Sequence, residues 1–90
     1  MQSESVLIGT KPLHSYILAA FTKFNENLCT KVILKARGRA ISRCVDVAEI
    51  ITKKYFKDIV DISDIRVSTV AINGNNISTI EIDLTRINHK

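Results

Sequence analysis

A chain of 90 residues has room for one small domain with a single thin core, and its 46% hydrophobic and 24% charged residues are a globular composition rather than a disordered one. Its apolar runs are far shorter than the ~20 residues that cross a membrane, and its N-terminus lacks the features of a signal peptide, so we expect a cytoplasmic protein without a membrane anchor. The net charge of +4 is uneven: residues 1–43 carry seven Lys and Arg against two Glu, whereas residues 44–90 carry six against seven Asp and Glu. A basic half of this kind suits a polyanionic partner, provided that the fold places these charges on one surface.

The first part of the chain predicts a strand, a helix and a second strand within one domain over residues 1–90. Residues 1–5 are polar, and we expect them to be frayed. The apolar run at residues 6–8 predicts a buried strand, and the helical spacing of apolar side chains predicts a helix over residues 12–25. Residues 31–36 are apolar and β-branched at their centre, which is typical of a central strand.

The second predicted helix, residues 40–56, is apolar over more than one face. Val47 and Ile50 extend the apolar surface beyond a single stripe. A helix with one solvated side does not need this, so we expect two packing partners, its own sheet and another subunit. On its polar side, Arg43 is expected to pair with Asp46, three positions along the helix.

The last part of the chain predicts a β-hairpin. The apolar alternation slips by one position near Ser63 and Asp64, which indicates a bulge, and Asn73-Gly74 is a strong hairpin-turn signal. Residues 79–85 alternate cleanly, with the odd-numbered side chains expected on the solvent face. The order βαβαββ predicts an α+β fold of two layers, in which two helices pack on one face of a four-stranded mixed sheet.

The most distinctive chemical feature is a basic turn between the second strand and the second helix. Four cations fall within nine residues: Lys35, Arg37, Arg39 and Arg43. Gly38 permits a positive φ or a close approach of the backbone to a ligand, and the start of a helix adds N–H groups that suit a phosphate. From the residues alone, this stretch is either a phosphate site or a solvated basic turn. Lys11, in the corresponding turn after the first strand, either joins it or is simply solvated.

The tip of the hairpin is polar but uncharged. Asn73 and Asn75 are either hydrogen-bonding groups for the groove edges or sugars of a nucleic acid, or parts of an ordinary polar turn. No Lys or Arg lies between Arg66 and Arg86.

No pattern in the sequence supports catalysis or metal binding. His14 and His89 have no nucleophile or metal ligand at a meaningful spacing. Cys29 and Cys44 are fifteen positions apart without a C-x-x-C motif, so we expect reduced and partly buried thiols. We therefore expect a protein that is not an enzyme and holds no metal and no cofactor.

Residues 32–43, which read Val-Ile-Leu-Lys-Ala-Arg-Gly-Arg-Ala-Ile-Ser-Arg, resemble the archaeal Alba family of chromatin-associated proteins. Shorter matches at residues 6–9, 11–12, 65–67 and 78–82 extend the resemblance over nearly the whole chain. The resemblance implies a dimer of βαβαββ subunits, similar to the C-terminal domain of a bacterial translation initiation factor. It also implies binding to double-stranded DNA and RNA with little sequence preference, in association with the chromosome.

In that family the basic turns of two subunits form a central saddle, and a pair of hairpin arms reaches along the nucleic acid. The resemblance implies a saddle made of Lys11, Lys35, Arg37, Gly38 and Arg39, with Arg43 nearby, and arm tips that carry Asn73 and Asn75. Dimer or dimer–dimer contacts are expected at four positions of the second helix: Val47, Ile50, Tyr55 and Phe56.

Two features depart from the family pattern. Many members have two lysines before the proline and can be acetylated on the first, whereas this chain has Thr10 at the first position. The hairpin arm is also shorter and uncharged, so we expect weak arm contacts. These departures motivate an alternative function, which is kept second: an assembly paralogue or ribonucleoprotein subunit with weak intrinsic binding that forms heterodimers with a more basic relative.

Overall fold

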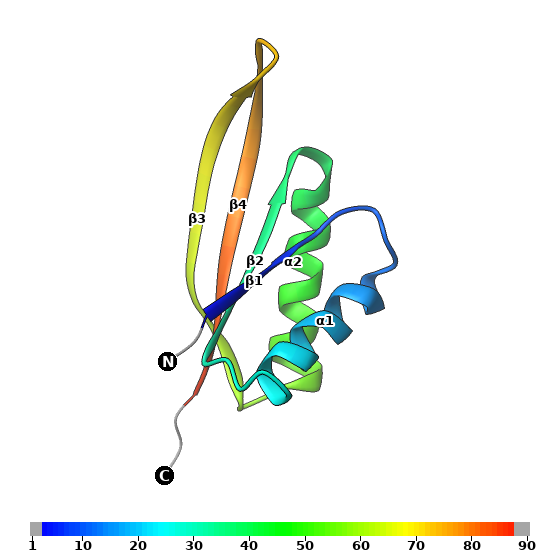
Figure 1. The fold of residues 1–90 in the computed structure, drawn as a ribbon, viewed down its shortest axis with the longest axis vertical. Helices are drawn as coiled ribbons and strands as arrows, with labels where there is room; N and C mark the ends of the chain where they lie inside the picture. The colour runs from blue at the N-terminus through cyan, green and yellow to red at the C-terminus, as the bar shows by residue number, and fades with distance from the viewer. Residues whose placement is uncertain (1–2, 88–90) are drawn as a thin grey trace.

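The computed structural model describes residues 3–87, and over this range two α-helices cover one face of a four-stranded sheet (Figure 1). The strands are β1 (Ser3–Leu7), β2 (Lys31–Arg37), β3 (Val60–Ile72) and β4 (Asn75–Arg86), and the helices are α1 (Leu13–Asn25) and α2 (Ile41–Ile50). The sheet order is β1-β2-β4-β3, with β1 parallel to β2 and the other neighbours antiparallel. The predicted α+β fold is confirmed.

β1 is longer at its N-terminal end than the sequence predicted. Residues 3–5 pair in parallel with residues 31–33 of β2, so the expectation that they are frayed is wrong, and residues 1–2 lie outside the described residues. Backbone pairing fixes these polar residues, because an edge strand needs only one hydrogen-bonded side. Ile8 follows the strand, yet it is buried and its N–H donates to the carbonyl oxygen of Lys35 at 2.7 Å.

The second helical stretch is continuous but changes its winding. A 3-10 turn, Gly38–Ala40, leads into α2, and a wider π-type turn, Ile51–Tyr55, ends it. α2 packs against β2 and β4 and also against α1. Val47 is fully buried among these elements. α1 of the same subunit is therefore a further partner of α2, and Val47 is covered within the subunit. Packing of α2 against another subunit stays a prediction.

Phe56 also belongs to the core of the subunit. It is 5% exposed, and its ring centroid lies 5.3 Å from that of Phe21 and 5.5 Å from that of Phe24, both on α1. Aromatic rings at these separations pack favourably. Phe56 packs the end of the second helical stretch against α1, and its place at a dimer or dimer–dimer interface stays a prediction.

β3 and β4 form a long hairpin around a two-residue turn. Asn73 and Gly74 have φ values of 51° and 79°, which matches the predicted turn and the right-handed twist of the strands. The pairing of β4 with β2 ends at Thr79. Residues 69–78 continue past the sheet as a projecting arm (Figure 1), and the arm contains no charged residue.

One extra residue, Ser63, shifts the register of β3 and confirms the predicted bulge. After it, Ile65 and Val67 pair with Ile82 and Ile80 of β4, so all four side chains point to the helix side of the sheet. The two β4 residues are buried there. The two β3 residues lie beyond the reach of the helices and are 52% and 72% exposed.

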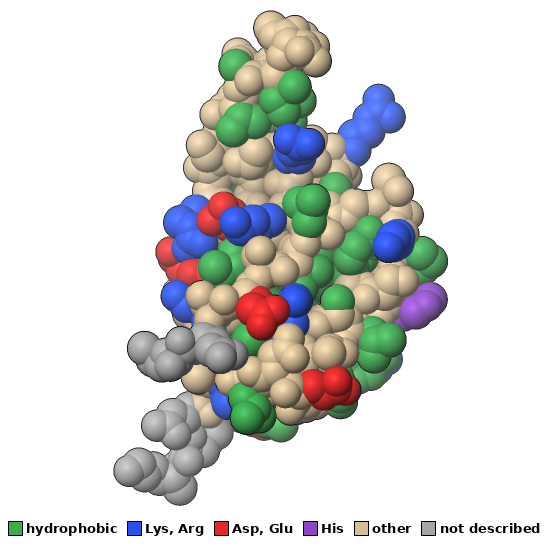
Figure 2. Space-filling view, viewed as in Figure 1, with side chains coloured by type: hydrophobic (Ala, Val, Ile, Leu, Met, Phe, Trp, Pro, Cys, Tyr) green, Lys and Arg blue, Asp and Glu red, His purple; other side chains and the backbone are tan. Residues whose placement is uncertain are grey.

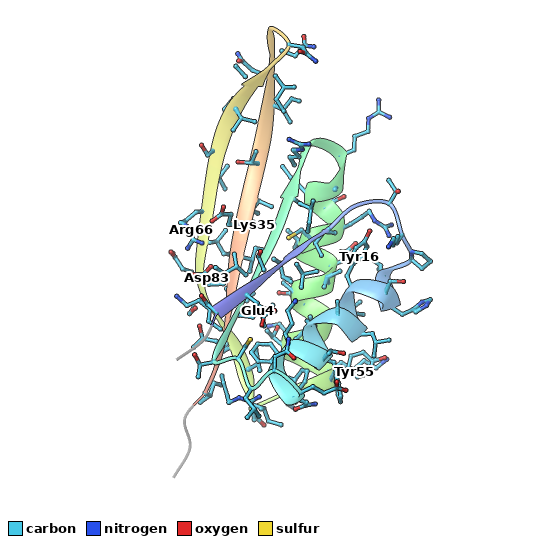
Figure 3. The ribbon with its side chains drawn as sticks, in the orientation of Figure 1. Glu4, Tyr16, Lys35, Tyr55, Arg66 and Asp83 are labelled. Carbon is cyan, nitrogen blue, oxygen red and sulfur yellow. The ribbon has the colours of Figure 1, made fainter. Side chains whose placement is uncertain are left out.

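The opposite face of the sheet carries an ion-pair cluster around Arg66 (Figure 3). Arg66 donates to both carboxylate oxygens of Asp83, at 2.8 and 2.9 Å, and also to Glu81 and Asp64. Asp83 lies on the predicted face, but it is only 5% exposed because Arg66 covers it. The hydrogen bonds from Arg66 hold the pKa of Asp83 below its ordinary value of 3.8, against the opposing effect of desolvation.

Asp83→Asn is expected to reduce the loss of stability in acid. Because the pKa of Asp83 is lower in the folded state, its stabilising effect is present above pH 3.8 and is lost as the pH falls through the folded-state pKa. Urea unfolding at pH 7 and pH 3 should therefore show a smaller difference in midpoint for Asp83→Asn than for the wild type. Asp46→Asn, at an exposed position of α2, is the control. An equal reduction in the control would contradict the prediction.

Candidate nucleic-acid interface

The loop after β1 and the basic turn after β2 lie at the same end of the sheet, because the two strands are parallel. Lys11 and Arg37, from these two turns, line a common hollow of about 370 Å³ together with Gly9 and Tyr16. The arm projects from this same end of the molecule (Figure 1). The structure therefore brings together cations that the sequence placed 26 positions apart.

The basic turn presents its two outer arginines to solvent. Arg37 and Arg39 are exposed, and on the face shown in Figure 2 basic side chains project beside the arm with no acidic ones next to them. Gly38 between them has a φ of +59°, which an L side chain rarely adopts. A Cβ atom at this position would meet the side chain of Ile77 only at 3.8 Å, so the backbone conformation rather than space favours glycine.

Lys35 faces the open side of the sheet, where it is partly neutralised. Its Nζ lies 3.8 Å from Glu81 Oε2, and its side chain is 44% exposed. Lys35 lines a second hollow of about 370 Å³ with Arg37 and Val70. Arg37 thus borders both hollows and links Lys11 on one side to Lys35 on the other, so that the three cations follow one continuous surface.

Arg43 is engaged in a way that the sequence did not predict. Its Nε donates to the carbonyl oxygen of Gly9 at 2.9 Å, and its Nη2 donates to the carbonyl oxygen of Lys11. These bonds cross from α2 to the loop after β1. The hydrogen bonds of Arg43 therefore go to the backbone of the neighbouring turn and not to Asp46, the partner expected from helical spacing.

Tyr16 belongs to this region, and the sequence analysis missed it. It is 7% exposed, and its hydroxyl accepts a hydrogen bond of 2.9 Å from the backbone N–H of Lys11. A Cβ atom on Gly9 would come within 3.3 Å of that hydroxyl, so glycine leaves room for it. From the sequence alone, Tyr16 is only one apolar position of a predicted helix. Its hydrogen bond to the Lys11 N–H depends on the path of the loop, which the sequence does not show.

The arm tip is separate from the basic surface. Asn73 and Asn75 are exposed at the far end of the arm, where Asn73 forms the turn and Asn75 begins β4. The arm holds both residues away from the body of the subunit (Figure 1). The structure thus offers two regions at one end of the molecule, a basic surface and an uncharged arm.

Two apolar surfaces are exposed elsewhere. One comprises Ile65 and Val67 of β3, and Val45 of α2 is a further exposed apolar side chain in the helix layer. The other is an apolar hollow of about 330 Å³ between α1 and the π-type turn, lined by His14, Ile17, Leu18, Phe21 and Tyr55. Tyr55 is 54% exposed (Figure 3), whereas Ile50 is half-buried.

The cysteines lie inside the subunit. Cys29 and Cys44 are both free and fully buried, and burial raises the pKa of Cys44 to about 11. Within residues 3–87, no group of three or more His, Cys, Asp or Glu residues is arranged to hold a metal ion. No helix in the same range is long and apolar enough to span a membrane.

Comparisons with known proteins agree with this geometry. The Alba family model matches residues 4–69. The chain is 49% identical to "DNA/RNA-binding protein Alba 1" of Archaeoglobus fulgidus, over 96% of this chain and 99% of that protein, and 42% identical to "DNA/RNA-binding protein Alba" of Picrophilus torridus, over 96% and 100%. The solved structure of Alba from Thermoplasma volcanium superposes with a TM-score of 0.84 at 43% identity, covering 91% of this chain and 99% of that one.

Proposed function

Because this chain belongs to the Alba family, we propose that it binds DNA and RNA through their phosphate backbones, with little sequence preference. The observation that carries the proposal is the convergence of Lys11, Arg37 and Lys35 around two adjoining hollows, with Arg39 exposed beside them. Lysine and arginine side chains neutralise phosphates irrespective of base sequence. Arginine adds paired hydrogen bonds to phosphate oxygens.

We propose that the binding unit is a homodimer formed through Ile65, Val67 and Val45. Exposed β-branched residues on an edge strand are typical of a surface that packs against another chain. This surface lies away from the open face, where Arg66 and its acidic partners are satisfied within the subunit. A homodimer presents two basic turns and two arms, which doubles the number of phosphate contacts.

The apolar hollow at Tyr55 is proposed as the contact between neighbouring dimers on a nucleic acid. Its lining is almost wholly apolar and includes exposed Leu18 and Phe21. That Tyr55 lies at a contact between dimers stays a prediction, which its exposure supports. We further propose a non-enzymatic role in coating and compacting the chromosome in the cytoplasm.

A salt titration tests the phosphate-binding mechanism. If a dimer neutralises roughly 6–8 phosphates, the logarithm of the association constant for duplex DNA should fall with the logarithm of salt concentration with a slope of about −5 to −7. Fluorescence anisotropy with several duplexes of unrelated sequence and with a structured RNA measures this slope directly. A slope near zero would contradict phosphate binding, and a strong dependence on sequence would indicate base readout.

The same titration distinguishes the alternative, an assembly paralogue or ribonucleoprotein subunit. The alternative rests on Thr10 and on the uncharged arm, both of which lower the charge available for binding. It is favoured if the homodimer binds weakly at physiological salt and native mass spectrometry with a more basic relative gives mixed dimers. Tight binding by the homodimer alone removes it.

A further inference from the structure

The backbone of the loop that carries Lys11 forms hydrogen bonds with side chains from two helices. Arg43 of α2 donates to the carbonyl oxygens of Gly9 and Lys11, and Tyr16 of α1 accepts the N–H of Lys11 at 2.9 Å. The loop lies between β1 and α1 and has no strand partner of its own along residues 9–11. Side chains from both helices therefore hold its backbone in one conformation.

We propose that Arg43 is a positioning residue, which holds Lys11 in place for nucleic acid and makes no phosphate contact of its own. The inference rests on the proposed function and refines it, because it removes one predicted contact residue and gives it another role. Two N–H groups of the Arg43 guanidinium, at Nε and Nη2, already donate to carbonyl oxygens. Ordering the loop during folding spares the complex the entropy cost of ordering it upon binding.

The geometry requires arginine at this position. The guanidinium is a planar fork that reaches two carbonyl oxygens two residues apart, whereas a lysine ammonium is a compact point charge. Arg43→Lys therefore preserves the net charge but not the pair of hydrogen bonds to the loop. Since lysine also binds phosphate, a direct phosphate contact would survive this substitution.

Binding of the full-length chain to duplex DNA tests the proposal. Arg43→Lys is expected to weaken binding about fivefold at fixed salt and to make the salt slope shallower by the same amount as Lys11→Ala does, because the contact that is lost is that of Lys11. Lys11→Ala should clearly weaken DNA binding when it is made in the wild type, but it should have little further effect on binding when it is made in the Arg43→Lys variant. Wild-type affinity of Arg43→Lys, or an equal effect of Lys11→Ala in both backgrounds, would overturn the proposal.

Hydrogen exchange in the free protein gives a readout that does not depend on nucleic acid. The Lys11 amide should exchange about tenfold faster in Arg43→Lys, and Tyr16→Phe should also speed its exchange, because each removes one restraint on the loop. Unchanged exchange at Lys11 in Arg43→Lys would overturn the positioning role alone. A wild-type chain that did not bind DNA would instead overturn the proposed function.

Arg86→Lys is the matched control. Arg86 donates to the carbonyl oxygen of Phe24 at 2.7 Å, which is the same kind of bond at a site remote from the basic turn. This substitution also preserves charge and removes a guanidinium fork. It should leave the DNA affinity and the exchange of Lys11 unchanged. If it weakened DNA binding as much as Arg43→Lys does, a general loss of rigidity would explain both results and the proposal would fail.

Discussion

Replacing Arg37 and Arg39 together by alanine is expected to weaken binding to duplex DNA about a hundredfold at low salt. Both side chains are exposed at the basic turn. Because each subunit loses two arginines, a dimer loses four. Each lost phosphate contact makes the salt slope shallower by about 0.9, so the slope should change by about 3 to 4. The loss should be similar for all duplex sequences, because phosphate contacts carry no sequence information. Anisotropy titrations over a range of salt concentrations measure both quantities.

Lys53→Ala combined with Lys57→Ala is the control for this experiment. It removes the same charge from exposed positions at the other end of the second helical stretch. Its effect on affinity should be small, because it changes only the net charge and not the local contacts. Equal weakening by the two double variants would show that total charge, rather than the basic turn, determines binding.

Val67→Glu is expected to convert the dimer into a monomer. Val67 is 72% exposed within the subunit, so the substitution should leave the fold and its circular dichroism spectrum intact. In the proposed dimer it would bury a carboxylate without a partner, which costs several kcal/mol and should weaken dimerisation at least about a hundredfold. Sedimentation equilibrium measures the assembly state. The salt slope for DNA should then fall to about half, because a monomer carries half the phosphate contacts.

Ser68→Glu places the same charge one residue further along β3, on the opposite face of the strand. It should leave the dimer intact. A wild-type chain that is monomeric at all concentrations, or a Val67→Glu variant that remains dimeric, would contradict the proposed interface.

The sequence predicted those elements that depend on local patterns. The spacing of apolar residues predicted α1 to within one residue of its observed start, and Asn73-Gly74 predicted the turn. The slip in alternation predicted the bulge at Ser63. The polar start of β1 was missed, because it is held by backbone pairing with β2 and side-chain hydropathy does not report that.

The interface positions and the partner of Arg43 depend on which elements become neighbours, which local patterns do not show. The apolar surplus on α2 predicted two partners for that helix, its own sheet and another subunit. The structure adds α1 of the same subunit as a partner, and periodicity does not distinguish α1 from a second subunit. Arg43 has an acidic residue at helical spacing, yet the loop carbonyls lie closer in space. One signal went unused: the two-residue turn fixes the register of the hairpin, which places Arg66 opposite Glu81 and next to Asp83.

The exposure of the basic turn follows from sequence more directly than the partners of the apolar residues do, for a physical reason. A short cluster of cations at a strand-to-helix turn stays exposed, because charged side chains are costly to bury. Arg37 and Arg39 therefore lie where the sequence indicated. Apolar residues can be satisfied inside or between subunits, and only the packed structure distinguishes the two outcomes.

The bulge at Ser63 limits how the length of the hairpin can change. Side chains alternate between the two faces of a strand, so a single insertion or deletion between the bulge and the turn would exchange the residues on the two faces. Val67 would then turn to the open face, and Arg66 would lose its place beside Asp83. The arm can therefore grow or shrink only by an even number of residues on each strand, with matching changes on both. Variation in reach among such proteins should come in steps of about 6.6 Å, the rise of two residues in an extended strand.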